Sequence, residues 1–106
     1  MSRREYILQS IKEKSAKIMP VNAKVILFGS QARGDYREDS DWDILILLDK
    51  QKLASTDYDD YAYPLFELGW HLDAEIHPLL YTFDDWERRS VLPLYKDVLK
   101  DGVELC

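Results

Sequence analysis

The chain has 106 residues, a hydrophobic share of 46% and a formal net charge of −6. This length predicts a single domain over residues 1–106, and an acidic chain without a basic stripe argues against a large nucleic-acid footprint. There is no apolar run long enough for a membrane span, and no apolar segment follows the charged N-terminus as it would in a secretory signal. The single cysteine, Cys106, excludes an internal disulfide, so we expect a cytoplasmic protein.

The first half of the chain is expected to contain one helix and two strands. Apolar side chains recur at helical spacing over residues 3–18. A short strand is predicted over residues 24–28 and a second over 42–48, whose consecutive apolar residues indicate burial on both faces. Between the strands, residues 31–34 form at most one helical turn, and residues 35–40 form an acidic loop.

The second half is expected to contain a helix, a strand and two closing helices. Helical spacing returns over residues 58–70, where Pro64 marks either a kink or a start. Alternation predicts a third strand over residues 72–81, and helices are predicted over 84–90 and 92–100. This order of elements predicts an α/β (α+β) fold in which a small mixed β-sheet is flanked by helices.

Gly29 and Ser30 directly follow the first predicted strand. A glycine at this place lets the backbone turn sharply and approach a ligand, and successive N–H groups can form a concavity for an anion. The Ser30 hydroxyl can donate to a phosphate oxygen, or it can simply cap a short helix that starts at Gln31.

Asp41 and Asp43 stand at the start of the second predicted strand. Side chains two apart on a strand share a face, so the two carboxylates project together while Trp42 points the other way. Oxygen ligands suit Mg²⁺, and such a pair can hold two ions roughly 4 Å apart. The alternative is a polar strand entry, but the acidic crowding from Asp35 to Asp43 favours a bound cation.

A third carboxylate is expected on the third predicted strand. A catalytic site with two metal ions usually needs one, either to complete the ligand shell of an ion or to take a proton. Asp73 and Glu75 share one face there. We choose Glu75 because it lies nearer the middle of the predicted strand, with Asp73 as the alternative, and both could instead form a solvent-exposed face. His77 shares this face, where a lone histidine is more often structural or exposed.

Arg33 has two expected roles of equal weight. It can pair with the oxygens of a triphosphate, or it can hold the acidic loop through Asp35 or Glu38. The sequence contains no zinc-type cluster and no nucleophile elbow that would indicate hydrolase chemistry.

The segment Gly29-Ser30-Gln31-Ala32-Arg33-Gly34 together with Ser40-Asp41-Trp42-Asp43 resembles the signature of the polymerase-β-like nucleotidyltransferase superfamily, in which ten residues separate the serine from the first aspartate. It is most similar to the minimal, or MNT-type, members. The resemblance implies transfer of a nucleoside monophosphate, with ATP as the expected substrate and two Mg²⁺ ions. It also implies catalytic and metal-binding roles for Asp41, Asp43 and Glu75, and nucleotide-binding roles for Gly29, Ser30 and Arg33.

The resemblance also implies a partner. Minimal members resemble antitoxins encoded beside a helical HEPN toxin, so a hydroxyl on such a protein is the expected acceptor. One alternative is a catalytically weak or inactive module of the same fold that neutralises its partner by forming a complex. Another is a small-molecule transferase completed by an oligomeric partner, including a second copy of this chain.

Overall fold

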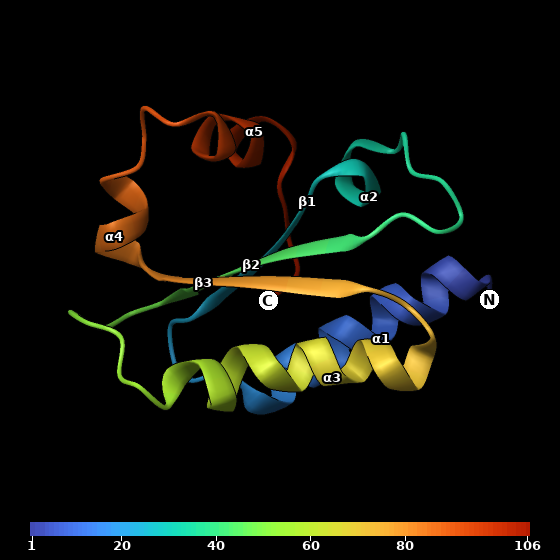
Figure 1. Cartoon of the computed structure of the whole chain (residues 1–106), viewed down its shortest axis with the longest axis horizontal. Coiled ribbons are helices and arrows are strands. Elements are labelled where there is room, and N and C mark those ends of the chain that lie inside the picture. The colour runs from blue at the N-terminus through green and yellow to red at the C-terminus, as the bar shows by residue number, and fades with distance from the viewer.

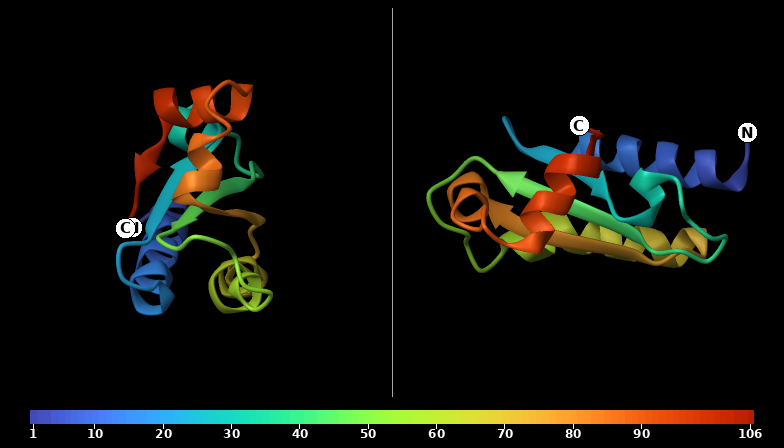
Figure 2. Two further views of the ribbon diagram at one scale, coloured as in Figure 1. Left: turned by 90° about the vertical axis from the view of Figure 1, so that its left-hand side faces the viewer. Right: turned by 90° about the horizontal axis from the view of Figure 1, so that it is seen from above.

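A four-stranded sheet forms the middle layer of the structure. The computed structural model describes all residues from 1 to 106. Helices α1 (Arg3–Ile18) and α3 (Tyr63–Leu72) cover one face of the sheet, and α4 (Phe83–Glu87) and α5 (Pro93–Asp101) cover the other (Figure 1). The view along the layers in Figure 2 shows the same separation. The expected mixed α/β architecture is confirmed. None of the helices is both long and apolar enough to cross a lipid bilayer.

The sheet has the strand order β3-β2-β1-β4, with bounds β1 (Lys24–Phe28), β2 (Trp42–Leu48), β3 (Ile76–Thr82) and β4 (Val103–Glu104). Strand β2 pairs antiparallel with β1 and parallel with β3. It therefore has a neighbour on each side, whereas β3 lies at an edge of the sheet. Two segments that are far apart in sequence, the starts of β2 and β3, come to lie side by side.

The core fixes the position of β2, because this strand is buried on both faces as predicted. Ile44, Ile46 and Leu48 belong to the cluster that packs against α1 and α3. Leu45 and Leu47 belong to the cluster on the opposite face, which contains Trp86 of α4 and Val98 of α5. A slip of one residue would exchange the two faces, so the hydrophobic clusters determine the register of the strand.

The link between β1 and β2 carries the Gly29-Ser30 segment that is expected to bind phosphate. It consists of the single turn α2 (Ser30–Arg33) and a loop that ends at Asp41. Trp42 is buried in the cluster beneath α1 and α3. Because side chains alternate along a strand, Asp41 and Asp43 face the opposite side of the sheet.

The predicted start of the third strand is wrong. The preceding helical region runs from a π-helical segment, η1 (Tyr58–Ala62), through α3 to Leu72, and β3 begins only at Ile76. Asp73 adopts the left-handed conformation at φ 52° and ends α3, and the Ala74 N–H donates to the Gly69 carbonyl at 2.9 Å. The alternation that begins at Leu72 therefore spans a helix end and a turn before the strand starts.

The C-terminal region differs from the prediction by one element. Thr82 caps α4 by accepting from the Asp85 N–H at 3.1 Å. Gly102 ends α5. The chain then returns to the sheet, where Val103 and Glu104 pair with β1 as strand β4. A strand of two residues has no periodicity, so the sequence pattern could not indicate it.

Asp57 anchors the connection between β2 and η1. Its side chain is buried, and its Oδ2 accepts from Lys50 Nζ at 2.8 Å and from the Ala54 N–H at 2.7 Å. These hydrogen bonds, from Lys50 first and Ala54 second, hold the pKa of the Asp57 carboxyl below its usual value of 3.8. The ionised carboxylate is thus part of the folded structure.

We expect Asp57→Asn to lower the free energy of unfolding at neutral pH by about 1.5–3 kcal/mol, the range for hydrogen bonds to a charged group. A lowered folded-state pKa stabilises the protein above the unfolded value of 3.8, and this stabilisation is lost as the pH falls through the folded-state pKa. Denaturant unfolding should therefore show a difference that shrinks below pH 4. Asp59→Asn, at an exposed neighbouring position, is the matched control, and equal effects of the two substitutions would contradict the assignment.

Candidate functional site

Gly29 and Asp43 are in direct contact where β1 ends and β2 begins. Phe28 is paired with Asp43 across the two strands, and Gly29 follows with φ 74° and ψ −159°. A Cβ atom added to Gly29 would lie 2.2 Å from Asp43 Oδ2. The carboxylate thus rests on the glycine backbone, in a conformation that is essentially restricted to glycine. The turn and the carboxylate converge on one place.

Ser30 is the first residue of α2, and Gly29, not Ser30, occupies the capping position without any side-chain cap. The capping role considered for Ser30 is therefore wrong. The first amides of a helical turn have no acceptor within the helix, so the Ser30 and Gln31 N–H groups can donate to a ligand at this turn.

Arg33 holds the acidic loop through Asp35. Its Nε lies 3.3 Å from Asp35 Oδ2, and both side chains are exposed. This is one of the two roles expected for Arg33. An exposed ion pair contributes little stability, so the guanidinium can exchange its partner when a phosphate is present.

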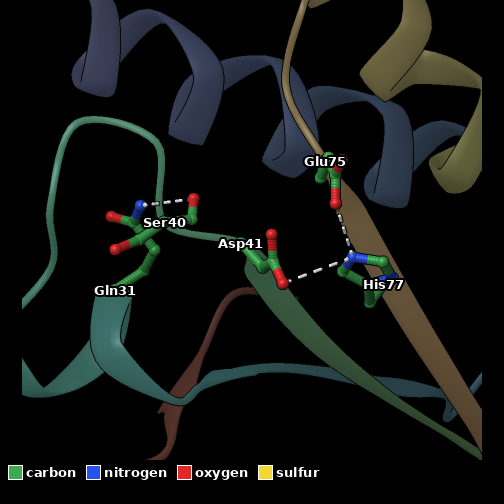
Figure 3. A network of polar contacts seen from close by, with 5 residues as sticks. All are labelled: Gln31, Ser40, Asp41, Glu75 and His77. Atoms are coloured by element: carbon green, nitrogen blue, oxygen red, sulfur yellow. Dashed lines mark hydrogen bonds and ion pairs between the residues drawn. The ribbon is translucent and has the colours of Figure 1, made fainter.

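Asp41, Glu75 and His77 form a cluster across the start of β2 and β3. The parallel register pairs Asp43 with His77. The Trp42 N–H also donates to the Glu75 carbonyl at 2.8 Å, which extends the pairing to the residue before the start of β3. His77 Nε2 lies 3.5 Å from Asp41 Oδ2 and 3.3 Å from Glu75 Oε2. Figure 3 shows the two carboxylates pointing toward the same ring nitrogen. One ligand atom from each of the three residues lies within 4.8 Å of the others.

Glu75, and not Asp73, is the residue that the structure brings into this cluster. The reason given from the sequence is wrong, because Glu75 precedes β3 and is not near its middle. It is placed instead by the backbone pairing with Trp42. Asp73 ends α3, and its carbonyl accepts from Arg3 at 2.5 Å.

The electrostatics around Asp43 favour a bound cation. Burial raises the pKa of the Asp43 carboxyl above its usual value of 3.8, and the neighbouring Asp41 charge raises it further. His77 and Arg33 act in the opposite direction but do not cancel the effect. The positive charge near Asp41 and Asp43 is too small to balance their two carboxylates. Together with Glu75, they form a set of hard oxygen donors that fits a divalent cation such as Mg²⁺.

Gln31 and Arg4 position the loop, and the sequence analysis did not single them out. The buried Gln31 side chain donates to the Ser40 carbonyl at 3.3 Å (Figure 3). Arg4 of α1 donates to the Gln31 side chain at 3.1 Å and to its carbonyl at 2.7 Å, and its guanidinium lies 4.6 Å from the Tyr36 ring centroid. The position of Gln31 between Ser30 and Arg33 was the only signal available in the sequence. These contacts tie α1 to the residue that precedes Asp41.

Comparisons with known proteins identify relatives of this chain. A family model described as the nucleotidyltransferase domain matches residues 4–105. Two curated relatives from Methanocaldococcus jannaschii, both provisionally named protein adenylyltransferases, are 45% identical over 49 residues and 50% identical over 46 residues. These alignments cover 46% and 40% of this chain, and the chain spans about half the length of the relatives, 49% and 46% respectively.

Two solved structures share the fold. One is a chain from a crystal structure described as a toxin–antitoxin with AMP-PNP, with a TM-score of 0.65 and 22% identity over 93% of this chain and 72% of the other. The second is a provisionally named nucleotidyltransferase from Sulfolobus solfataricus, with a TM-score of 0.57 and 24% identity over 96% of this chain and 81% of the other.

We expect Gly29→Ala to weaken the uptake of Mg²⁺ and ATP at least about tenfold, because the new methyl group displaces the Asp43 carboxylate. The backbone strain should also cost about 1–3 kcal/mol of stability. Isothermal titration calorimetry and thermal melting measure the two effects. Gly34→Ala is the matched control, since Gly34 also has a positive φ, +91°, but a Cβ there meets nothing within 4 Å. Equal loss of nucleotide binding in both variants would contradict the proposed contact.

Proposed function

Because the chain belongs to the nucleotidyltransferase domain family, we propose that it transfers AMP from ATP to a hydroxyl group of a partner protein, with Mg²⁺ as its cofactor. One observation carries the proposal. The site residues form a row across three neighbouring strands of the sheet. The row runs from Gly29 after β1, through Asp41 and Asp43 at the start of β2, to Glu75 just before β3. A turn suited to phosphate lies at one end of this row, and a carboxylate suited to accept a proton lies at the other.

The triphosphate would bind at the β1 end of the row. Gly29 lets the backbone come close to the ligand, and the amides and hydroxyl at Ser30 donate to the β- and γ-phosphate oxygens. Arg33 is near enough to Asp43 to affect its pKa, so its guanidinium can leave Asp35 and pair with a phosphate oxygen.

Asp41, Asp43 and Glu75 are the residues that would hold two Mg²⁺ ions. When bound, the ions supply charge stabilisation for the attacking and leaving oxygens. Asp41 lies near Glu75 and is close enough to Asp43 to raise the pKa of that carboxyl, so it is the carboxylate placed to contact both ions. His77 reaches Asp41 and Glu75 and keeps their side chains pointing toward each other.

The order of residues in the row sets the direction in which the acceptor and the leaving group would lie during AMP transfer. The acceptor oxygen forms a bond to the α-phosphorus, the bond from that phosphorus to the bridging oxygen of pyrophosphate breaks, and Glu75 takes the hydroxyl proton. Attack in line with the leaving group is the usual geometry of phosphoryl transfer. Since pyrophosphate would leave on the Gly29 side, the acceptor would approach from the β3 side.

A groove of about 310 Å³ lies on that side, between the edge strand β3 and α3. Its lining includes Glu75 and His77, as well as Phe66 and Trp70 of α3. Phe66 and Trp70 pack edge to face with ring centroids 5.4 Å apart, and Trp70 is 62% exposed. A broad aromatic surface next to a proton acceptor suits a polypeptide segment that carries the reacting hydroxyl.

A protein acceptor is also supported by the names of the two curated relatives, both protein adenylyltransferases. The HEPN toxin implied by the sequence resemblance remains the candidate partner, and this chain would act as its antitoxin. The description of the first structural relative, a toxin–antitoxin with AMP-PNP, is in keeping with this role.

We expect label from α-³²P-ATP to appear on the protein encoded beside this one when Mg²⁺ is present, and to fall at least about 100-fold in the Asp41→Asn plus Asp43→Asn variant. Loss of the two carboxylates removes the residues that would hold the ions. Autoradiography after gel electrophoresis measures the transfer.

The matched control replaces another acidic pair, Asp59→Asn plus Asp60→Asn, which is exposed on η1. Complex formation with the neighbouring protein but no labelling, unaffected by the aspartate substitutions, would indicate neutralisation by binding instead of catalysis. Label on a small molecule alone would indicate a metabolite acceptor.

We expect Trp70→Ala to raise KM for the protein acceptor by about 5- to 30-fold, because an exposed aromatic contact of this kind contributes about 1–2 kcal/mol to an interface. KM for ATP should stay unchanged, since Trp70 lines the groove beside Glu75, at the end of the row that is remote from Gly29. Steady-state labelling rates at varied acceptor and ATP concentrations separate the two constants. Tyr6→Ala removes an exposed aromatic side chain from α1 and should leave both unchanged, and an effect of Trp70→Ala on ATP alone would place the groove on the nucleotide side.

A further inference from the structure

His77 supplies a nitrogen atom where an all-oxygen magnesium site would have none. Its Nε2 lies 3.3 Å from one Glu75 oxygen and 3.5 Å from one Asp41 oxygen. Ligand atoms about 2.1 Å from a common ion are separated by about 3.0–3.4 Å in octahedral or tetrahedral order. The two distances from the imidazole are thus close to those between atoms that share one metal ion, and the Asp41 and Glu75 oxygens lie within 4.8 Å of each other.

The position of the imidazole is fixed by the sheet. His77 is the second residue of β3 and is paired in register with Asp43, while Glu75 bonds through its carbonyl to Trp42. Two residues from each of the two neighbouring segments therefore lie together: Asp41 and Asp43 on one side, and Glu75 and His77 on the other. A ligand on a paired strand is placed by the backbone ladder, so the imidazole is presented to the carboxylates before any ion binds.

The three groups are also open to an ion. The side chains of His77, Asp41 and Glu75 are 46%, 50% and 75% exposed, respectively. An ion held by one nitrogen and two carboxylate oxygens would keep positions for water or substrate. Mg²⁺ prefers oxygen ligands alone, whereas an imidazole nitrogen suits divalent transition metals.

We propose that Asp41, Glu75 and His77 form a mixed nitrogen and oxygen site that binds a divalent transition metal ion more tightly than Mg²⁺. His77 is then the residue that sets the metal preference of the site. This inference rests on the site assigned under the proposed function, but it concerns ion binding and needs no nucleotide, acceptor or turnover. The alternative for the same contacts is an ion pair only, in which the ring serves the carboxylates as a partner and never binds a metal.

The test uses Co²⁺ as the probe, because it is a divalent transition metal ion whose paramagnetism shifts the NMR signals of the groups that bind it. In the unmodified protein, Co²⁺ bound to His77 should move its ring-proton signals far outside the diamagnetic range of the NMR spectrum, which proximity without a bond does not do, and leave those of His71 unchanged. His71 is the other histidine of the chain, and it lies exposed at the end of α3. This measurement needs no substitution, so it stands even if a variant fails to fold.

Affinities then separate ligation from ion pairing. We expect His77→Gln to lower the Co²⁺ affinity at least about tenfold, the range for loss of a group that tunes a metal site, and to change the Mg²⁺ affinity less than about threefold. His71→Gln is the matched control and should change neither. An unperturbed His77 ring together with unchanged Co²⁺ affinity in His77→Gln would overturn the inference and leave an ion pair only.

The two proposals can fail separately. AMP transfer that is supported by Mg²⁺, with Co²⁺ binding independent of His77, would overturn this inference and leave the proposed function intact. Co²⁺ binding that depends on His77, without transfer of AMP under any divalent ion, would support this inference and remove the proposed function.

Discussion

The double-sided burial of β2 is the constraint on which the site depends. Its alternate residues pack into the two hydrophobic clusters on opposite faces of the sheet, so a shift of one residue would move every side chain to the wrong face. Asp41 and Asp43 continue the alternation beyond the buried run. The energy that fixes their direction therefore comes from Ile44 to Leu48 and not from the polar residues of the site.

The same burial makes the site electrostatically unfavourable without a ligand. Asp43 lies against the backbone of Gly29 and close to a second carboxylate, and its pKa is raised by that burial first. Only His77 and Arg33 act against this effect, and Arg33 is engaged with Asp35. A rigid sheet can maintain such an arrangement because the hydrophobic clusters would have to be disrupted to relieve it. A bound cation would relieve it without any change in the fold.

The sequence was sufficient for those parts of the site that lie on strong local patterns. The apolar run of β2, the glycine turn and the pair of aspartates all follow from periodicity and spacing, and the structure brings them together. The partners of Asp41 on β3 were harder to predict, because the turn at Asp73 delays the strand by four residues. Its place on the predicted strand is the wrong reason for choosing Glu75, which precedes β3, and the sequence pattern gives His77 no distinct role. Their importance follows from the parallel register, which depends on how α3 packs and has no signature within the segment itself. The contacts of Gln31 with Arg4 and Ser40 join three distant segments, so local reasoning could not find them.

The two ends of the row lie in different structural surroundings, and this difference affects how an acceptor could be recognised. The residues that would bind phosphate lie on a turn between two interior strands, where backbone geometry leaves little freedom. The β3 end of the row lies at the sheet edge and is bordered by the half-buried Phe66 ring and the exposed Trp70 ring of α3. A substitution at Trp70 changes no contact in the register of β2 and β3, whereas one at Gly29 displaces Asp43. On the proposed assignment, substitutions on α3 can therefore change the preference for an acceptor without changing the residues that bind the nucleotide. The reason is that the groove at the sheet edge lies outside the packing that fixes the carboxylates.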